Sequence, residues 1–324
     1  MADYINILGQ NVQVLISDPA NPTQGQVWYN TTANALKGQA ATTSGAWASG
    51  GTLNNNRNFS AGTGTQTAGA IFGAPSTNGT TTAPAGSIES YNGSTWTNGP
   101  NMVTKRTRLG GAGTQTSALG FGGYSNPPNI PSHTSTEEYN GTSWTSSGGL
   151  NTGRNSLGGC GIQTAALATG NTTATESYNG SVWTNVNLLN TGRAGLSAEG
   201  TQTSSLAFGS WPSASNTATE SWNGTNWTTV SSLNTGRGLL GGSGSSNTSV
   251  LAFGGLIPGN SSSVESWNGT SWATASPNLG SARYGLSGFG TQSSALAAGG
   301  SSPHTTTEEW TGPGVPLTVT ITTS

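Results

Sequence analysis

Most charged side chains in this sequence recur at a fixed spacing, which suits them to ion pairing. The chain has 324 residues but only 9 Lys and Arg and 11 Asp and Glu. Six arginines each precede a short "GTQT"-like segment, and a glutamate follows each segment further along the chain. The recurring residues are Arg57, Arg106, Arg154, Arg193, Arg237 and Arg283, and Glu89, Glu137, Glu176, Glu220, Glu265 and Glu308. Charges that repeat with a fold are typical of structure, so we expect Arg–Glu pairs, within or between repeats, that fix register.

The acids outside these positions offer few candidates for a catalytic pair of carboxylates. A glycosidase that works with two carboxylates needs a pair of acids that do not belong to the repeat. The non-repeating acids are Asp3, Asp18, Glu138, Glu199 and Glu309. Glu138 and Glu309 directly follow repeat glutamates, so we expect their side chains to point to the opposite face of the strand.

The two histidines and the single cysteine do not complete a metal or nucleophile site. His133 and His304 each lie four residues before a repeat glutamate, in different copies of the repeat. A shared metal would need a third ligand, and no cysteine or spare carboxylate clusters with them. Cys160 occupies a position held elsewhere by Ala112 and Ser243, which favours a buried small residue over a nucleophile. We therefore predict no catalytic residue, no metal site and no cofactor.

The elements that must position these residues follow from the repeat. Nine residues after each arginine comes a signal residue: Gln66, Gln115, Gln163, Gln202, Ser246 and Gln292. An apolar run, the glutamate, an Asn-Gly pair and a tryptophan follow in most copies. We read four short strands in each copy, and four antiparallel strands in about 45 residues is the pattern of a propeller blade. The repeated Tyr and Trp residues are expected to fill the space between blades, with their polar ends hydrogen-bonded.

The Asn-Gly pairs predict a tight turn between the third and fourth strands. They begin at Asn92, Asn140, Asn179, Asn223 and Asn268. A two-residue hairpin loop of this composition is typically a type I′ turn, in which both central residues have positive φ.

The repeat resembles the Kelch family over residues 44–310. The resemblance implies an all-β, six-bladed β-propeller. It rests on a Gly-Gly doublet after an apolar strand and on an aromatic residue followed at fixed spacing by tryptophan. The doublets are Gly122-Gly123, Gly254-Gly255 and Gly299-Gly300, and the aromatic pairs include Tyr91 with Trp96 and Tyr139 with Trp144.

The first and last copies predict how the ring closes. The sixth copy lacks the hairpin and its tryptophan, while Trp47 stands unpaired before the first copy. We therefore expect the strand around Trp47 to complete the sixth blade, which removes an open edge. The predicted divisions are a short N-terminal segment at 1–43, the propeller at 44–312 and a C-terminal strand or tail at 313–324.

Candidate ligand residues lie where the repeat varies. The connection between the second and third strands differs most in length, and in a propeller these connections emerge on one face. The variable loops are 74–88, 124–136 and 210–219, and the candidate ligand-binding residues are Tyr124, Asn129, His133, Trp211 and His304. The alternative for Tyr124 and Trp211 is that each packs on its own loop.

The N-terminal segment resembles part of another class of protein. Residues 17–38, "SDPANPTQGQVWYNTTANALKG", are similar to a short segment near the start of virion structural proteins of tailed phages, particularly marine ones. The resemblance implies a virion protein, present in many copies, that binds other virion structural proteins through this segment. The start "MADYINILGQ" lacks the features of a secretory signal, which fits assembly in the host cytoplasm.

Charge and hydropathy argue against two kinds of partner. The net charge is −2 and no basic cluster occurs, so we predict no nucleic-acid binding. No apolar run approaches the roughly 20 residues needed to span a bilayer, so we predict no membrane insertion.

These observations favour a non-enzymatic protein of the phage virion surface, of the tail-fibre or adhesin type. Its propeller loops would bind the host cell surface, with a glycan as the expected receptor. Two alternatives stay open: a capsid decoration protein without a receptor role, and a carbohydrate-active enzyme on a Kelch scaffold.

Overall fold

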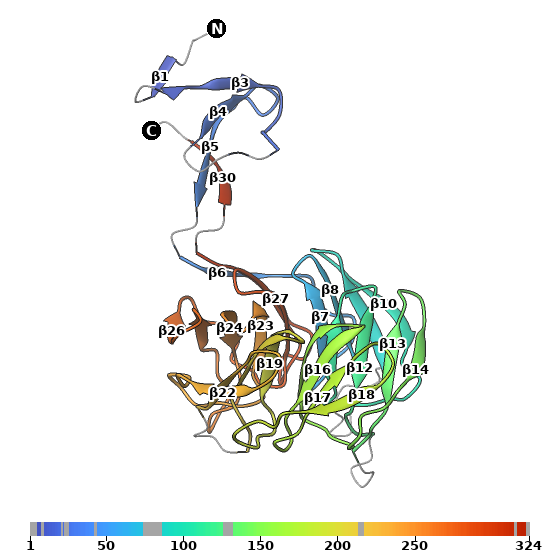
Figure 1. The fold of residues 1–324 in the computed structure, drawn as a ribbon. Coiled ribbons are helices and arrows are strands. Elements are labelled where there is room, and N and C mark those ends of the chain that lie inside the picture. The colour runs from blue at the N-terminus through green and yellow to red at the C-terminus, as the bar shows by residue number, and fades with distance from the viewer. Residues whose placement is uncertain are drawn as a thin grey trace. The chain divides into compact units, whose positions relative to one another are not determined.

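The chain is built from β-strands. The computed structural model describes residues 5–7, 10–20, 22, 26–41, 44–73, 86–125, 132–212, 217–313 and 316–321. Every regular element in these ranges is a strand, which confirms the predicted all-β class for the described residues. The chain forms two compact units, Trp47–Trp310 and Met1–Ala46 with Thr311–Ser324 (Figure 1).

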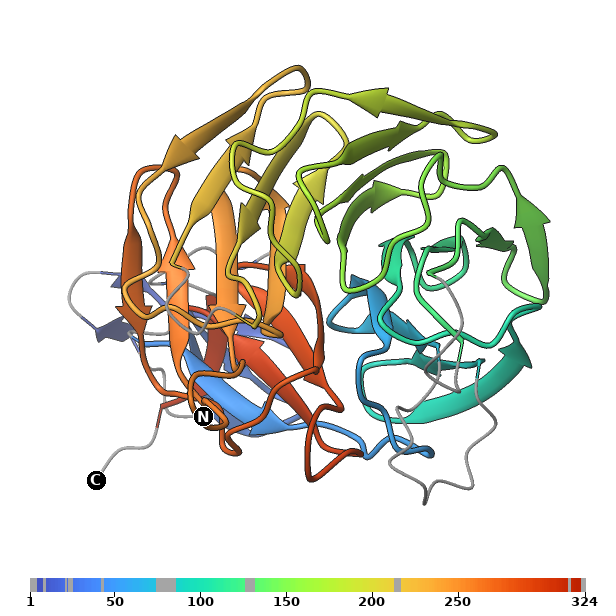
Figure 2. The same cartoon turned by 90° about the horizontal axis from the view of Figure 1, so that it is seen from below.

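The larger unit contains repeated four-stranded antiparallel sheets that follow one another around a common centre (Figure 2). In five of these sheets the four strands are consecutive in sequence. The first three sheets are β7 (Ala61–Thr65), β8 (Ala68–Phe72), β9 (Ser87–Tyr91) and β10 (Trp96–Asn101); β11 (Gly110–Gly113), β12 (Ala118–Phe121), β13 (Thr136–Tyr139) and β14 (Trp144–Ser147); and β15 (Gly158–Ile162), β16 (Ala165–Thr169), β17 (Thr175–Tyr178) and β18 (Trp183–Val186). The next two are β19 (Ser197–Thr201), β20 (Ser204–Phe208), β21 (Thr219–Trp222) and β22 (Trp227–Val230); and β23 (Gly241–Ser246), β24 (Ser249–Phe253), β25 (Val264–Trp267) and β26 (Trp272–Ala275).

The sixth sheet of this unit combines its two ends. It consists of β27 (Ser287–Thr291), β28 (Ser294–Ala298), β29 (Thr307–Thr311) and β6 (Ala46–Ser49). The strand that contains Trp47 therefore occupies the fourth position of the last sheet. Trp47 packs there against Trp310, with ring centroids 5.3 Å apart.

The first strand of each sheet is rich in glycine because neighbouring sheets approach closely there. These strands contact one another in the order β7, β11, β15, β19, β23 and β27, and β27 also contacts β7. A Cβ at Gly111 would lie 2.9 Å from the Cβ of Ala61, and a Cβ at Gly159 would lie 2.7 Å from the carbonyl oxygen of Gly111. Larger residues at these positions would push adjacent sheets apart.

The tryptophan that starts each fourth strand ties its sheet to the preceding one. Trp183 packs on Tyr178, with ring centroids 4.9 Å apart, and its indole Nε1 donates to Thr136 Oγ1 at 2.9 Å. Equivalent bonds join Trp96 to Thr307, Trp227 to Thr175 and Trp272 to Thr219. At the two remaining positions Ile88 and Val264 stand where the threonine would be, and the Nε1 atoms of Trp144 and Trp47 have no hydrogen-bond partner. The residue type at this one repeat position therefore decides whether the indole N–H is bonded: threonine accepts the hydrogen bond, and isoleucine or valine does not.

The predicted type I′ turns at Asn-Gly are wrong. In the first copy Gly93 has a φ of 92°, but Asn92 is not in the positive-φ region. Asn92 Oδ1 instead accepts hydrogen bonds from the backbone N–H groups of Ser94 and Thr95, at 3.0 and 2.9 Å. The asparagine is therefore used for its side-chain acceptor, which caps a longer hairpin loop, rather than for a left-handed backbone.

The recurring glutamine of the "GTQT" segment bridges adjacent sheets. Gln163 Nε2 donates to the carbonyl oxygens of Ala118 and Tyr139 in the preceding sheet, at 2.9 and 2.7 Å. In the fifth copy the pattern assigned this position to Ser246, but Asn247 makes the bridge to the preceding sheet. The pairing of β23 with β24 is irregular near its end, which shifts the position by one residue.

The smaller unit contains a mixed four-stranded sheet and a separate two-stranded sheet, which precedes it in the sequence. Its order is β3 (Gln13–Leu15), β4 (Val27–Asn30), β5 (Ala35–Ala41) and β30 (Pro316–Thr320), and β1 (Ile5–Ile7) pairs with β2 (Gln10–Asn11). β3 and β4 are parallel, while β30 is antiparallel to β5. The strand of the C-terminal segment 313–324, β30, therefore pairs with the N-terminal strand β5.

Asp18 organises the polar contacts of this smaller unit. Its carboxylate accepts hydrogen bonds from the buried Trp28 (3.0 Å), from Asn30 (2.7 Å) and from Lys37 (2.8 Å). These bonds, the one from Lys37 above all, lower the pKa of Asp18 to about 2. Asp18, which belongs to the segment 17–38, thus has a structural role.

Candidate binding site

Each sheet of the larger unit contains one buried Arg–Glu pair. The shortest nitrogen–oxygen distances lie between 2.6 and 3.0 Å for five pairs, and the sixth pair, Arg237–Glu265, is also in contact. All twelve side chains are at most 7% exposed. In every case both partners belong to the same copy of the repeat.

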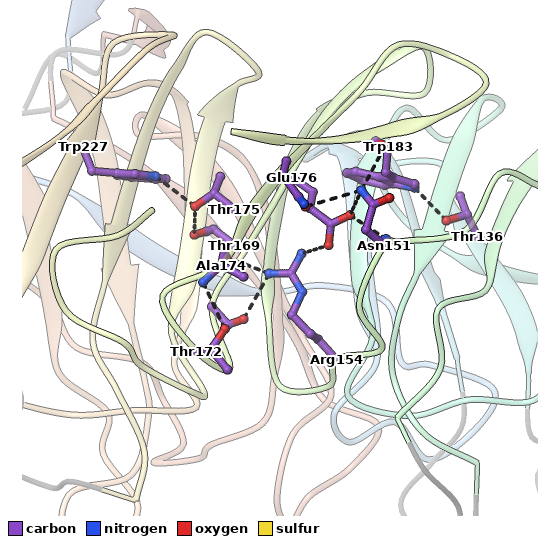
Figure 3. Close-up of polar contacts among 12 residues, drawn as sticks. Thr136, Asn151, Arg154, Thr169, Thr172, Ala174, Thr175, Glu176, Trp183 and Trp227 are labelled. Atoms are coloured by element: carbon purple, nitrogen blue, oxygen red, sulfur yellow. Dashed lines mark hydrogen bonds and ion pairs between the residues drawn. The ribbon is translucent and has the colours of Figure 1, made fainter. Parts of the chain in front are cut away.

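The ion pair joins two segments of the same copy. One is the connection between the second and third strands, and the other is the segment that leads into the first strand. Arg154 donates to the carbonyl oxygens of Gly170 (3.3 Å) and Ala174 (2.7 Å) and to Glu176 (2.8 Å), as Figure 3 shows. Glu176 also accepts a bond from the backbone N–H of Asn151 at 2.7 Å. Burial lowers the pKa of Arg154, and the charge of Glu176 opposes this shift. These partners offset much of the desolvation of the pair, and the buried Nε of Arg154 is left without a hydrogen-bond partner.

This arrangement explains how connections of unequal length share one geometry. Arg57 donates to the carbonyl oxygens of Gly73 and Ser87, at 2.7 and 2.9 Å, across one of the longest connections. Arg154 makes the same pair of bonds across the much shorter connection from Gly170 to Ala174. The arginine holds both ends of the connection, so the residues between them can vary without moving the sheet.

Two residues after each of these arginines, the backbone forms a closed ring of hydrogen bonds. Each residue at this position has a positive φ between 51° and 65°, and its N–H donates to the carbonyl oxygen of its counterpart in the preceding sheet at 2.7 to 2.9 Å. The bond from Phe59 to Gly285 joins the first sheet to the sixth. The six residues are Phe59, Arg108, Ser156, Gly195, Leu239 and Gly285.

The side chains of this backbone ring line a cavity on the face that carries the variable connections. The cavity has about 500 Å³ of empty volume, part of it open solvent, and each sheet contributes the ring residue and the residue after it. The ring residues are of four different types besides glycine: an aromatic, a cation, a hydroxyl and an aliphatic side chain. The backbone conformation at this position is thus the same in every sheet, whereas the side chain that it presents to the cavity differs.

Arg108 is the distinctive residue of the cavity. Its guanidinium carbon lies 4.2 Å from the ring centroid of Phe59 and 5.5 Å from that of Trp211. Its Nη1 makes one long hydrogen bond to Ser156 Oγ, at 3.4 Å, and its Nε has no partner. Among the described residues no carboxylate pairs with it. The donors that remain for a ligand are therefore those of its two Nη atoms, because Nε is buried.

The structure brings one of the predicted ligand residues, Trp211, next to Arg108 of this cavity, and it places Tyr124, His133 and His304 elsewhere. Trp211 stands beside Arg108, and its backbone N–H donates to Ala194 at 2.7 Å. Tyr124 forms a two-bond β-bridge with Thr107, the residue before Arg108. Asn129 lies outside the described residues.

The two histidines are each engaged within their own loops. His133 Nε2 lies 2.7 Å from Ser125 Oγ, and burial, more than the charge of Arg106, lowers its pKa below 6.5. His304 Nδ1 lies 2.6 Å from the carbonyl oxygen of Gly300. In the part of the chain that is described, no three His, Cys, Asp or Glu residues gather in a way that could hold a metal.

Sequence reasoning missed the residues that make the cavity. Phe59, Ser156 and Leu239 share a position but no residue type, so the repeat pattern does not mark them. One signal was available: Arg108 is the single arginine outside the repeated set.

The channel beneath the cavity contains one carboxylate. Glu199 lines it among backbone glycines of the first strands and accepts a bond from Ser197 at 2.8 Å. Burial raises the pKa of Glu199 to about 8. Cys160, at the same repeat position, is buried, and burial raises the pKa of its thiol to about 12.

The other non-repeating acids of this unit are bound to tyrosines. Glu138 accepts a hydrogen bond from Tyr178 at 2.6 Å, and Glu309 accepts one from Tyr91. Both tyrosines belong to the sheet that follows. Burial, assisted by these carboxylates, raises the pKa of each tyrosine to about 12. Neither acid is placed for catalysis at the cavity.

Comparisons with known proteins define the fold alone. No protein-family model matches the chain, and no curated protein matches it. Among solved structures, one described as "Structure of YjhT" is similar, with a TM-score of 0.62 and 13% sequence identity over 83% of this chain and 97% of that chain. This likeness and the repeated sheets together define a propeller-like all-β protein. No described helix has the length and apolar character to cross a membrane.

Proposed function

We propose that the chain is a six-bladed, Kelch-like propeller that acts as a non-enzymatic surface protein of a tailed-phage virion, of the tail-fibre or adhesin type. Its variable face binds the surface of the host cell, with a glycan as the receptor. The six-bladed reading is supported by the cyclic contacts of the first strands and by the hydrogen bond from Phe59 to Gly285.

The observation that carries the binding function is the cavity at Arg108. Small-molecule sites combine apolar and aromatic surface with a few polar groups that fix orientation. Here Phe59 and Trp211 provide aromatic faces, and Arg108 and Ser156 provide donors at the same place. The Arg–Glu pairs hold the surrounding connections at their bases, so the face combines a rigid frame with loops of variable sequence.

The virion role rests on the smaller unit. Its segment 17–38 carries the resemblance to tailed-phage virion proteins, and the unit is compact in itself. In this proposal the smaller unit binds other virion structural proteins, in many copies on the particle, after assembly in the host cytoplasm. Neither nucleic-acid binding nor membrane insertion is part of the proposal.

One observation favours the enzyme alternative, and it is weaker. Glu199, with a pKa of about 8, would be protonated near neutral pH and could serve as a general acid. A second carboxylate is needed for the usual glycosidase mechanisms, and none other lines the described parts of the channel. The other alternative, a capsid decoration protein, requires only that the cavity bind no receptor on the host cell.

Binding and turnover measured together test the proposal. The full chain is applied to an array of bacterial surface polysaccharides, and released sugars are followed in the same samples. Saturable binding without sugar release is expected. Release that disappears in Glu199→Gln would favour the enzyme, and binding to no polysaccharide would leave the decoration protein as the better description.

A further inference from the structure

Arg108 occupies a backbone position at which glycine would be easier to accommodate. Its φ is 53°, in the left-handed region that disfavours residues with a Cβ. Gly195 and Gly285 hold the equivalent positions in two other sheets and make the same backbone hydrogen bonds. The side chain of Arg108 is therefore not needed to form the ring.

The guanidinium is also unlike the six other arginines of the chain. Those six are buried and each pairs with a glutamate, whereas Arg108 is half-buried, has aromatic rings on its flanks and has no carboxylate partner among the described residues. A guanidinium that is partly desolvated and has free donors binds a carboxylate through two parallel hydrogen bonds. The electrostatic surroundings do not oppose this, because the pKa of Glu199 in the channel below is about 8.

We propose that Arg108 is the anion subsite of the glycan site and holds the carboxylate of an acidic sugar, while Phe59 and Trp211 contact the ring of that sugar. This inference rests on the proposed glycan binding and narrows it to uronic-acid-type ligands. A carboxylate is favoured over a phosphate because one cation is present, and its other close polar neighbour, Ser156, is neutral. The planar, singly charged group matches one guanidinium.

The test uses the full chain and three immobilised probes: oligogalacturonate, the same oligosaccharide with its carboxyls methyl-esterified, and a sulfated galactan. Arg108→Gly is the informative variant because the chain already uses glycine at this position of the ring. Asn34→Gly is the backbone control, because Asn34 also has a positive φ (50°) but belongs to the smaller unit, and Lys105→Gln is the control for an exposed charge.

The expected result is that the unmodified chain binds the acid about tenfold to a hundredfold more tightly than the ester. Arg108→Gly loses this preference, while Asn34→Gly and Lys105→Gln keep it. Equal binding of acid and ester, or an acid preference that survives in Arg108→Gly, overturns the inference. Tighter binding of the sulfated galactan overturns the assignment to carboxylate.

The failure of this inference is distinguishable from failure of the proposed function. If the chain binds neutral bacterial polysaccharides but not oligogalacturonate, glycan binding stands and the anion subsite is wrong. If it binds no polysaccharide at all, both fail.

Discussion

Two arginines that stand two residues apart, Arg106 and Arg108, have opposite surroundings. Arg106 is fully buried and bonds to Glu137 at 2.9 Å and to the carbonyl oxygens of Gly122 and Ser135. Arg108 lies in the cavity, over an aromatic ring, with one long bond to a hydroxyl. The first arrangement occurs in all six sheets, and the second occurs once.

The difference shows how a repeated fold separates stability from recognition. An arginine that recurs with the repeat is paired with a glutamate and also bonded to at least one backbone carbonyl oxygen in each sheet. Arg108 occurs once and the repeat supplies no carboxylate partner for it, so its bonding capacity is left for something outside the chain. Chemical identity is therefore a weaker guide to role in this protein than periodicity.

The largest effect is expected when the repeated arginine is changed. Arg106→Met leaves Glu137 buried without its cation, so we expect the free energy of unfolding to fall by about 3–5 kcal/mol. Arg108→Gly removes no ion pair, and we expect a change within about 1 kcal/mol. Urea unfolding of both variants measures the two values.

A second repeated site provides the control for this comparison. Arg154→Met should match Arg106→Met, because Arg154 has the same set of partners. Comparable losses for Arg106→Met and Arg108→Gly would mean that the two arginines do not differ in role.

A smaller effect is expected from Glu199, the non-repeating carboxylate that lines the channel. Its folded-state pKa of about 8 lies above its ordinary value of 4.5. Its protonated form is favoured in the folded state, so its contribution is complete below pH 4.5 and is lost as the pH rises through 8. We expect Glu199→Gln to be more stable than the unmodified chain at pH 9, relative to pH 5, by about 2–4 kcal/mol after allowance for solvent in the channel.

Urea unfolding of both proteins at pH 5, 7 and 9 measures this difference directly. Substitution of Glu138, which is bonded to Tyr178, is the control for the loss of a carboxylate elsewhere. A pH-independent gap between the unmodified chain and Glu199→Gln would show that Glu199 titrates normally.

The smallest effect concerns the tryptophans that join the sheets. Thr219→Val removes the acceptor for Trp272 Nε1 at nearly constant volume, and we expect a loss of about 1–2 kcal/mol. Val264→Thr is the reverse change, beside the unpartnered Nε1 of Trp47, and should be neutral or stabilising by up to about 1 kcal/mol. Thermal unfolding compares the two. A loss at Val264→Thr as large as at Thr219→Val would contradict the equivalence of the two positions.

The sequence indicated the repeated contacts because they depend on residue type. Arg57 and Glu89 are identifiable by charge and spacing, and the strand at Trp47 by its missing partner. Details that depend on backbone conformation were less accessible. The role of Asn92 lies in an acceptor bond rather than in its φ, and one extra residue in a strand moves the bridge from Ser246 to Asn247.

The cavity was largely inaccessible to sequence reasoning for a related physical reason. Its members share a left-handed backbone and a place in the ring of hydrogen bonds, and neither property leaves a fixed residue type. Trp211 was predicted from its place outside the repeat. Arg108 was not predicted, although it also lies outside the repeat. Only the fold shows that these two residues, 103 positions apart in sequence, meet.

The claim on which the account depends is that the backbone closes into a ring and thereby frees the side chains at the cavity to vary. Hydrogen exchange of the six ring amides, followed by NMR, tests it most directly. The account predicts that the Phe59 amide, which makes the closing bond to Gly285, exchanges as slowly as the amides of Ser156 and Leu239 inside the ring. A Phe59 amide that exchanges orders of magnitude faster than those two would contradict it, since the ring would then be open between the first and sixth sheets.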